Sequence, residues 1–453
     1  MISKTKKITI NGAGLIGPYL GILLRRRGFD VEVLEKRSDI RKITAEAGRS
    51  INLVLTSRGI NALKNINKWE EVKKITMPVS GRMMHSTSGE LTYQPYGGDG
   101  DVNYSISRTE LNRFMISEAE KLGVKFLFST DVKQIDEAKN LLILKNKKGE
   151  EVSHEFEVLI GADGAGSVVR KKILKLQNIE DKVDWLGVSY KELFMPTNAD
   201  GSEQIDKESL HIWPRGKHML MALPNLDSSF TMTLYLPEKD SEVNFDQLKT
   251  PENVESYFEK FHPDSIPLMP NYLEDFGQNK TSKLGTVRCS SWSHNGKMGI
   301  IGDAAHAIVP FFGQGTNSGL EGCVVFDEIF DRYENWDDLF NGFFDSYKSN
   351  ADAIAKMAEE NYSEMSEKVG DEKFLLRKKL ESFLHEKFPK KFLNRYMMVT
   401  YSNIPYSLVY KIGMKQTEFL NSLDIDNTSD FEKIDLKIVE SFLDQEILPL
   451  IKV

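Results

Sequence analysis

The sequence contains little cysteine, with only Cys289 and Cys323 among 453 residues. Two cysteines cannot build a disulfide framework or a four-cysteine zinc site, and so low a count is typical of a reducing compartment. No apolar run approaches the roughly 18 residues that a membrane-spanning helix needs. The N-terminal apolar run stops at Asn11, too early for a signal peptide. We therefore predict a cytoplasmic protein without a membrane span.

The chain also lacks an excess of positive charge. Its 59 lysine and arginine residues face 67 aspartate and glutamate residues, which leaves a formal net charge of −8 at pH 7. Nucleic-acid-binding domains usually carry a basic patch or stripe, so this balance argues against a nucleic-acid partner. No cluster of histidine and cysteine has metal-ligand spacing, and no Ser-His-Asp arrangement is evident. The length and the 40% hydrophobic content predict a globular protein of about two or three domains.

What the sequence does contain begins with a glycine-rich turn. Residues 8–11 predict a short strand, Gly12-Ala-Gly-Leu-Ile-Gly17 follows, and an apolar stretch of helical spacing ends near Arg27. In this pattern the first glycine permits the tight turn, the second lets a pyrophosphate approach the backbone, and the third lets helix and strand pack closely. Glu35 ends the next strand about 20 residues further on, where an acid accepts hydrogen bonds from a ribose. The glycine pattern alone is weak evidence, but strand, helix and acid together predict a dinucleotide site.

Two later segments indicate that the dinucleotide is FAD rather than NAD. Residues 158–170, which include Asp163, resemble the second fingerprint of flavoprotein hydroxylases, and residues 300–306, which include Asp303, resemble the third. Either aspartate alone would also fit an ordinary turn at the end of a strand. Three fingerprints in the order of that class favour bound FAD. No second glycine fingerprint begins a βαβ unit, and the hydroxylases of this class bind NADPH transiently without one.

The rest of the sequence predicts a β-rich insertion and a helical C-terminal part. Alternating runs between about 180 and 290 indicate antiparallel strands, and the chain beyond about 320 is mostly of helical pattern. The predicted fold class is α/β. Its parts are a Rossmann-like FAD-binding domain at residues 1–180 and 285–325, an inserted antiparallel β-sheet substrate domain at 181–284 with contributions from about 75–105, and a helical part at 326–453.

The chain resembles one family in particular, the kynurenine 3-monooxygenases, which have the p-hydroxybenzoate hydroxylase fold. The resemblance extends from the first strand to about Tyr406, and its most specific piece is the long block 302–315. The segments that carry it are Gly48-Arg-Ser-Ile-Asn-Leu53, Gly81-Arg-Met-Met-His85, Leu210-His-Ile-Trp-Pro-Arg215, Ala222-Leu-Pro-Asn225 and Gly302-Asp-Ala-Ala-His-Ala-Ile-Val-Pro-Phe-Phe-Gly-Gln-Gly315. It implies hydroxylation of L-kynurenine to 3-hydroxy-L-kynurenine with bound FAD, transient NADPH and O₂, by way of a flavin C4a-hydroperoxide.

The resemblance also implies a substrate site. The family's arginine for the amino-acid carboxylate falls on Arg82, and its polar partners fall on Tyr96, Asn361 and Tyr396. A guanidinium binds a carboxylate bidentately, and the tyrosine hydroxyls and the amide add directional hydrogen bonds. The remaining positions, around the aromatic ring, are Met219, Met221, Leu223, Tyr235, Pro310, Phe311 and Met365. These apolar side chains would exclude water from the reacting ring.

The expected FAD contacts combine the fingerprints with family positions. Arg108 matches an arginine that contacts the flavin, and Gln314 matches a residue that lines both flavin and substrate. The predicted cofactor residues are Gly12, Gly14, Leu15, Gly17, Glu35, Arg37, Arg108, Asp163, Asp303, Gly313, Gln314, Gly315 and Asn317. No acid, base or metal ligand is assigned. His306 and His85 are better explained as histidines that hold their loops by hydrogen bonds than as proton donors.

One departure from the family keeps an alternative open. Tyr235 stands where the family usually has phenylalanine, and this adds a hydroxyl close to the expected ring site. The nearest alternative is therefore a flavin hydroxylase that acts on another aromatic amino acid or an aromatic acid. A second alternative is a non-catalytic flavin-binding or electron-transfer module. If an aromatic substrate stimulates NADPH oxidation, this alternative is excluded. Either a monomer or a homodimer fits the sequence, and the C-terminal membrane anchor of the animal enzymes is not expected here.

Overall fold

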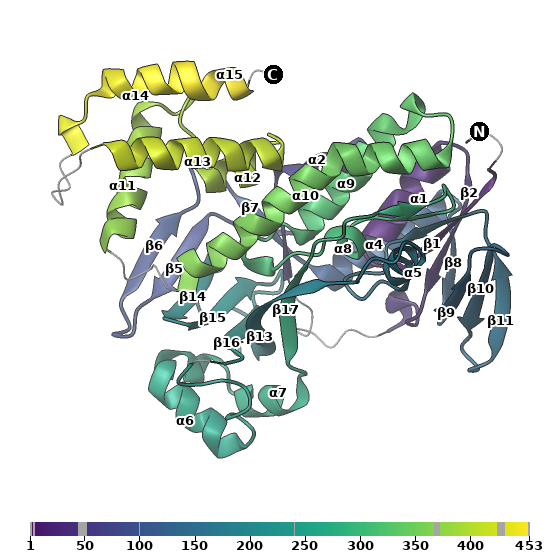
Figure 1. Ribbon diagram of the computed structural model, residues 1–453. Helices are drawn as coiled ribbons and strands as arrows, with labels where there is room; N and C mark the ends of the chain where they lie inside the picture. Colours follow the sequence, from purple (N-terminus) through teal and green to yellow (C-terminus); the bar gives the residue numbers. More distant parts are fainter. Residues whose placement is uncertain are drawn as a thin grey trace.

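The computed structural model describes residues 2, 5–43, 52–98, 100–239, 241–366, 372–423 and 431–451. Residues 48–51, which begin one of the family-like segments, lie outside this part of the chain. The described residues form four β-sheets and a set of C-terminal helices that gather on one side (Figure 1). This mixed α/β architecture with a helical C-terminal region confirms the predicted fold class, while the domain boundaries remain a prediction.

The glycine-rich turn belongs to a six-stranded, mostly parallel sheet. The strands in spatial order are β18 (Ser293–His294), β19 (Met298–Ile300), β12 (Val158–Gly161), β1 (Lys7–Asn11), β2 (Asp30–Glu35) and β8 (Lys125–Phe128). β1, β2 and β12 are buried along almost their whole length, as apolar strands of a covered parallel sheet are. The helices around this sheet are α1 (Ile16–Arg26), α4 (Arg108–Lys121) and α5 (Val168–Leu176). The predicted strand, turn, helix and strand are therefore β1, the glycine turn, α1 and β2.

Two smaller antiparallel sheets adjoin this unit. One has the order β11 (Glu151–Glu155), β10 (Leu141–Lys145) and β9 (Asp131–Asp136). The other has the order β3 (Asn52–Leu55), β7 (Asn103–Ser107) and β4 (Met77–Val79). Two helices, α2 (Ser57–Asn65) and α3 (Trp69–Lys73), connect β3 to β4. The second small sheet brings residues 52–56 and Asn103 to the border between the two large sheets.

A seven-stranded sheet forms the other half of the molecule. Its order is β17 (Ser282–Val287), β13 (Val183–Met195), β16 (Phe230–Pro237), β15 (His218–Pro224), β14 (Ser209–Arg215), β5 (Gly81–His85) and β6 (Leu91–Pro95). All neighbours are antiparallel except β14 and β5, which are parallel. β5 and β6 come from a part of the chain that precedes β13 by about 90 residues, so the sheet joins two distant segments. Side chains alternate between its two faces.

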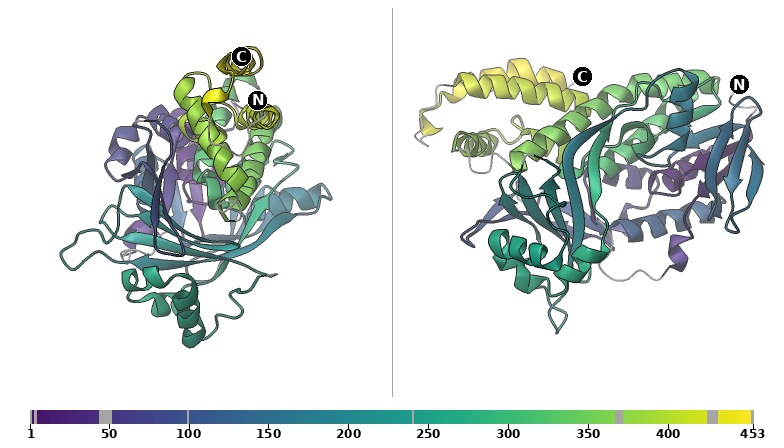
Figure 2. Two further views of the ribbon diagram at one scale, coloured as in Figure 1. Left: turned by 90° about the vertical axis from the view of Figure 1, so that its left-hand side faces the viewer. Right: turned by 60° about the horizontal axis from the view of Figure 1, so that its bottom comes forward.

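Helices cover both faces of the seven-stranded sheet. On one side lie α6 (Pro251–Phe261) and α7 (Tyr272–Gln278), packed on a core that includes Phe230, Leu234 and Phe258. On the other side lie the C-terminal helices, and Figure 2 shows the three layers. These helices are α10 (Trp336–Ser366), α11 (Glu372–Lys387), α12 (Arg395–Tyr401), α13 (Tyr406–Ser422), α14 (Leu436–Phe442) and α15 (Leu448–Ile451). The preceding helix α9 (Gly315–Ile329) packs instead on α1 and α2, in the core of the six-stranded sheet.

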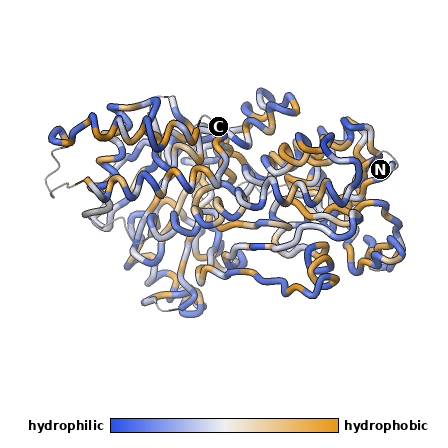
Figure 3. The backbone as a smooth tube through the Cα atoms, turned by 45° about the horizontal axis from the view of Figure 1, so that its top comes forward, coloured by the Kyte–Doolittle hydropathy of each residue, from blue (hydrophilic) through white to orange (hydrophobic). Residues whose placement is uncertain are grey.

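The C-terminal helices mix hydrophobic and hydrophilic residues along their length (Figure 3). Their apolar side chains join a core that also contains Ile212 and Met219 of the seven-stranded sheet. Among the described residues, no helix combines the length and the apolar character that crossing a bilayer requires. The amphipathic pattern instead serves packing against the sheet and between the helices.

Five of the eight histidines are buried, and four of them lie in or beside the seven-stranded sheet. The imidazoles of His85 and His211 are joined by a hydrogen bond of 2.9 Å. The hydroxyl of Tyr257 lies 2.8 Å from His218 and 3.1 Å from His262. Burial lowers the pKa of His85 and His218 to about 4 and also lowers the pKa of His211 and His262. These side chains are therefore neutral in the folded protein near pH 7.

We expect the free energy of unfolding to fall as the pH is lowered from about 6.5 to about 4. Below pH 6.5, the ordinary histidine pKa, these histidines become protonated in the unfolded chain. In the folded protein His85 and His218 stay neutral down to about pH 4, so protonation between these two values favours unfolding. Each such histidine changes the free energy of unfolding by up to about 1.4 kcal/mol per pH unit in this window. Thermal melting across the window measures the effect, and His218→Gln should flatten it. A melting temperature that stays constant down to about pH 4.5 would contradict this expectation.

Candidate active site

A cavity of about 480 Å³ extends from the glycine turn of the six-stranded sheet to the face of the seven-stranded sheet. Both large sheets, β3 and the segment 308–316 contribute to its wall. One end is lined by glycines and carboxylates, and the other by tyrosines and apolar side chains. The cavity thus joins the predicted cofactor residues to the predicted substrate residues.

The glycine turn forms a close-fitting cradle at the first end. Gly12 has a φ of +114°, and a Cβ there would lie 2.5 Å from the carbonyl oxygen of Ala162. A Cβ on Gly17 would lie 1.9 Å from the carbonyl oxygen of Gly12, so helix α1 can pack this closely only with glycine at that position. A Cβ on Gly14 meets no protein atom within 4 Å and would project into open space at the cavity wall. The three positions therefore fit the turn, the phosphate approach and the helix contact of a dinucleotide site.

Glu35 lies at the end of β2 with its carboxylate held in place. Its Oε2 accepts a hydrogen bond of 2.9 Å from the backbone N–H of Ala13, and its Oε1 accepts one of 2.9 Å from the backbone N–H of Arg37. The residue is only 6% exposed, yet it lines the cavity. Ordered in this way, the carboxylate is suited to accept a hydrogen bond from a ribose hydroxyl.

The two other fingerprints place a carboxylate each at the same cavity. Asp163 accepts hydrogen bonds from the side chain of Asn11 at 2.9 Å and from the backbone N–H of Val168 at 2.8 Å, at the start of α5. Asp303 begins the short helix α8 (Asp303–His306) after Gly302. Burial raises the pKa of both carboxyl groups, and for Asp303 the positive charge of Arg108 opposes the shift. Together with the cradle, this donor and acceptor set fits FAD.

Ten of the predicted cofactor residues line the cavity, and three do not. The ten are Gly12, Gly14, Leu15, Glu35, Arg37, Arg108, Asp163, Asp303, Gly313 and Gly315. Gly17 provides the helix contact described above. Asn317 accepts a hydrogen bond from the backbone N–H of Thr56 at 2.9 Å and donates to the carbonyl oxygens of Val54 and Gly313. Gln314 is fully buried and forms hydrogen bonds with Tyr406 and Thr56. The side-chain amides of Asn317 and Gln314 therefore stabilise the segments that line the cavity without lining it themselves.

At the other end, Arg82 lies beside two stacked tyrosines. The rings of Tyr96 and Tyr396 are 5.2 Å apart and inclined by 16°, and the Arg82 guanidinium lies 5.4 and 5.0 Å from their centroids. Asn103 donates a hydrogen bond of 2.9 Å to the Tyr396 hydroxyl. Within the described part of the chain Arg82 has hydrogen bonds to Tyr96 and Tyr396 but no carboxylate partner, and its buried Nε has no hydrogen-bond partner. A cation in such surroundings is matched by an anionic ligand.

The predicted ring positions form the apolar part of the wall. Tyr235 and Phe311 face each other with ring centroids 5.3 Å apart, and the cavity is also lined by Met221, Leu223, Pro310 and Met365. Two predicted substrate residues lie outside the cavity lining. Met219 shares a face of the sheet with its register partner Tyr235, but it is fully buried in the core formed with the C-terminal helices. Asn361 donates a hydrogen bond of 2.7 Å to the carbonyl oxygen of Phe311, and it thereby supports the loop that carries this ring.

Several residues of the cavity wall were not predicted from the sequence. Thr231 and Thr233 precede Tyr235 on β16 at intervals of two, and Tyr190 is the partner of Tyr235 in the strand register. The period of two along β16 would have identified the two threonines once Tyr235 was assigned. Asn103, which binds Tyr396 from β7, has no comparable signal in the sequence.

The role predicted for His306 is wrong in its chemistry. Neither ring nitrogen has a hydrogen-bond partner. The ring instead packs between Trp292 and Tyr347, with centroids 5.3 and 5.5 Å away. Burial lowers the pKa of His306 to about 4, so it is a neutral packing residue near pH 7. His85, by contrast, does make the hydrogen bond expected of it, to His211.

Fold and cavity together define an FAD-dependent monooxygenase. A family model described as an FAD binding domain matches residues 5–361. Solved structures of similar fold include the tetrameric form of 2-methyl-3-hydroxypyridine-5-carboxylic acid oxygenase, with a TM-score of 0.63 and 19% identity over 79% of this chain and 91% of that one. Klebsiella pneumoniae HpxO complexed with FAD and uric acid has a TM-score of 0.62 and 18% identity over 84% of this chain and 92% of that one.

Sequence relatives specify the family within this class. The kynurenine 3-monooxygenase of Myxococcus xanthus is 40% identical over 98% of this chain and 96% of its own length. Those of Flavobacterium psychrophilum and Dictyostelium discoideum are each 40% identical over 97% of this chain, and over 99% and 97% of their own lengths. The chain belongs to the kynurenine 3-monooxygenase family.

Proposed function

We propose that this protein hydroxylates L-kynurenine to 3-hydroxy-L-kynurenine, with NADPH as the reductant. One atom of O₂ is inserted into the ring C–H bond next to the carbon that bears the amine. The other atom leaves as water, which takes up the hydride of NADPH and one proton from solvent, and NADP⁺ is released. The observation that carries the proposal is Arg82, a cation at the cavity wall that has two tyrosines beside it and no carboxylate partner among the residues the structure describes.

The side chains at the substrate end match the chemistry of kynurenine. Its carboxylate would bind the Arg82 guanidinium bidentately, and the hydroxyls of Tyr96 and Tyr396 would add hydrogen bonds. The aniline ring would lie against Phe311 and the neighbouring apolar wall, which keeps water away from the reacting carbon. Bound FAD would supply hydride acceptance and oxygen activation. The ring amine makes the adjacent carbon electron-rich, so no protein base is assigned.

The other parts of the proposal depend on different support. The described cavity lining includes one glycine cradle, which FAD would occupy. A permanently bound NADPH would need a cradle of its own, so the lining agrees with NADPH as a transient reductant. The residues that would hold FAD are those of the cradle, Glu35 and the two fingerprint aspartates. The domain boundaries, the cytoplasmic location, the monomer or homodimer state and the route of oxygen activation remain predictions.

The test is an aerobic incubation of the purified yellow protein with NADPH and L-kynurenine, with products identified by mass spectrometry. We expect a product heavier by one oxygen atom, formed in step with the loss of NADPH. Stimulated NADPH loss that yields peroxide and no new product would mean that kynurenine is an effector or a poor analogue. No stimulation by any aromatic compound would favour the non-catalytic flavin module.

Tyr235 supports a second candidate, a hydroxylase of a different aromatic acid. Its hydroxyl lies at the cavity wall within reach of Thr233. For L-kynurenine we expect Tyr235→Phe to change kcat/KM by no more than about threefold, because Thr233 rather than the substrate would bind the hydroxyl. A substrate that hydrogen-bonds to this hydroxyl should instead lose about 5- to 150-fold, as removal of a buried hydrogen-bond partner does. A substrate panel on both proteins decides between them.

A further inference from the structure

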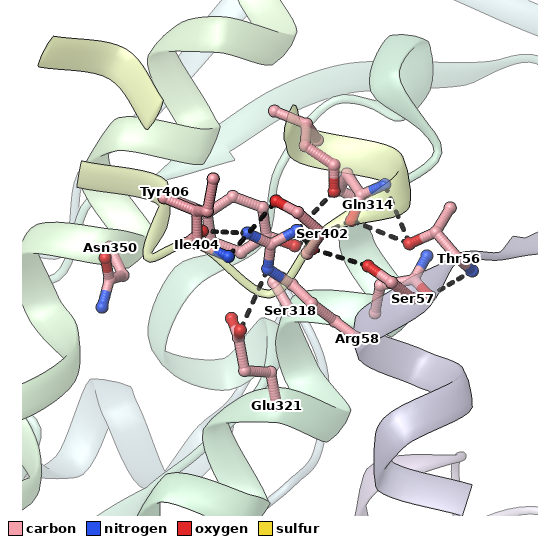
Figure 4. A network of polar contacts seen from close by, with 12 residues as sticks. Thr56, Ser57, Arg58, Gln314, Ser318, Glu321, Asn350, Ser402, Ile404 and Tyr406 are labelled. Atoms are coloured by element: carbon pink, nitrogen blue, oxygen red, sulfur yellow. Dashed lines mark hydrogen bonds and ion pairs between the residues drawn. The ribbon is translucent and has the colours of Figure 1, made fainter. Parts of the chain in front are cut away.

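A buried polar network links residues 56–58 to Gln314, Glu321 and the segment 402–406 (Figure 4). At its centre is Arg58, in the first turn of α2, whose side chain has 0% solvent exposure. Its Nε forms an ion pair of 2.9 Å with Glu321 on α9. Its guanidinium lies 3.8 Å from the ring centroid of Tyr406, the first residue of α13. One carboxylate and one aromatic face thus compensate a fully buried positive charge.

The rest of the Arg58 guanidinium binds the C-terminal end of α12 and the segment that follows this helix. Nη1 donates to the carbonyl oxygens of Val399 and, at 3.0 Å, of Ser402, while Nη2 donates to the carbonyl oxygen of Ile404. The hydroxyl of Ser57 donates a further hydrogen bond of 2.6 Å to Ser402. The last carbonyls of a helix have no partner within it and carry partial negative charge, so a guanidinium there acts as a C-terminal cap.

The capped helix carries a residue of the proposed substrate site. α12 has seven residues, too few to be stable without external contacts. Tyr396 lies in its first turn and stacks on Tyr96 and on Phe312, whose ring centroid is 5.7 Å away. Its hydroxyl accepts the hydrogen bond from Asn103 described above. The position of Tyr396 beside Arg82 therefore depends on what holds α12.

The network also reaches the loop at the FAD end of the cavity. The hydroxyl of Tyr406 donates a hydrogen bond of 2.7 Å to Gln314. The amide of Gln314 donates one of 3.3 Å to Thr56, which directly precedes the turn that carries Arg58. Gly313 and Gly315, on either side of Gln314, line the cavity. The same set of contacts thus fixes both α12 and the cavity loop.

We propose that Arg58 is a positioning residue for the hydroxylation. It does not line the cavity, but it holds α12 so that Tyr396 stays stacked on Tyr96 beside the substrate-binding Arg82. The inference rests on the proposed function, because the expected effect of losing Arg58 is a weaker affinity for the carboxylate of L-kynurenine. Loss of the clamp frees Tyr396 to move, and displacement of a binding group by about 1 Å is enough for large kinetic effects.

The test compares Arg58→Met and Arg58→Lys with Lys191→Met as a matched control. Lys191 is another buried cation that caps carbonyls, those of Phe276 and Asn279 at 2.7 and 2.8 Å, at the end of α7. We expect Arg58→Met to raise KM for L-kynurenine about tenfold or more, with kcat changed by less than about threefold. Hydrogen exchange of residues 395–401 in the substrate-free protein should accelerate about tenfold. Lys191→Met should lower the melting temperature without either effect.

Arg58→Lys keeps the charge but not the fork, so one ammonium cannot serve three carbonyls and Glu321 together. Arg58→Lys should also raise KM for L-kynurenine and accelerate hydrogen exchange of residues 395–401. It therefore tests the proposal even if Arg58→Met does not fold. Unchanged KM and unchanged exchange of residues 395–401 in a folded Arg58 variant would overturn the proposal. If the wild-type protein fails to turn over kynurenine, the proposed function fails, whereas the exchange measurement still tests the clamp.

Discussion

Replacing Arg82 with methionine should weaken L-kynurenine binding by about 10- to 150-fold and leave the ligand-free protein at least as stable as before. A hydrogen bond to a charged group contributes about 1.5–3 kcal/mol, which corresponds to that range of affinity. In the protein itself Arg82 has two aromatic neighbours and no carboxylate partner among the described residues. Methionine removes a charge that the two tyrosines stabilise but no described carboxylate neutralises, and it fills similar space, so the free energy of unfolding should stay the same or rise.

The measurements are substrate titration and thermal melting of the purified Arg82→Met protein. The matched control is Arg215→Met on the neighbouring strand β14. Arg215 donates a hydrogen bond of 3.0 Å to the carbonyl oxygen of His85 and lies 3.8 Å from Asp264, away from the cavity wall. This control should melt at a lower temperature with an almost unchanged KM. If Arg82→Met left KM within about twofold of the wild-type value, the carboxylate assignment would be wrong.

Replacing Gly14 with alanine should yield a folded but nearly colourless protein. A Cβ at this position meets no protein atom within 4 Å, so the apoprotein has room for it. It would occupy the space through which a pyrophosphate approaches the backbone. We expect FAD affinity to fall at least about tenfold, equivalent to about 1.4 kcal/mol, with the apoprotein melting temperature unchanged. Absorbance of the purified protein and titration with FAD measure the effect.

The contrasting variant is Gly17→Ala, three residues along the same turn. Its Cβ would lie 1.9 Å from the carbonyl oxygen of Gly12, and the backbone of α1 would have to move. Overpacking of this kind costs about 1–3 kcal/mol or more, so the apoprotein should melt at a lower temperature even without FAD. If Gly14→Ala destabilised the apoprotein as much as Gly17→Ala, the assignment of Gly14 to the phosphate approach would be refuted.

The nucleotide half could be predicted from the sequence because its signals are local. The turn from β1 into α1 needs glycine at Gly12 for its φ of +114° and at Gly17 for its contact with the Gly12 carbonyl oxygen, and both reasons are local. Glu35 follows at the end of the next strand, and its carboxylate bonds to the backbone of Ala13, within the same βαβ unit. Spacing alone was therefore sufficient to predict the strand, the helix and the acid.

The substrate half could be anticipated only through resemblance, because its residues are far apart in the sequence. Arg82 lies on β5 and Tyr96 directly follows the neighbouring strand β6, but Tyr396 comes from a helix about 300 residues later. Residue type and sequence context also did not distinguish residues that line the cavity from residues that support its wall. Asn361 and Gln314 carry amides suited to a ligand, yet both are directed to protein groups in this structure.

By itself the sequence determined the α/β class, the FAD fingerprints and the family, since each of these is encoded in short segments in a fixed order. The tertiary structure alone decided which polar groups face the cavity and which are consumed by other protein groups. Arg58 illustrates the difference, because its partners lie at Glu321 and between Val399 and Tyr406. A buried charge is stable only when several distant groups converge on it, and no local spacing encodes that convergence.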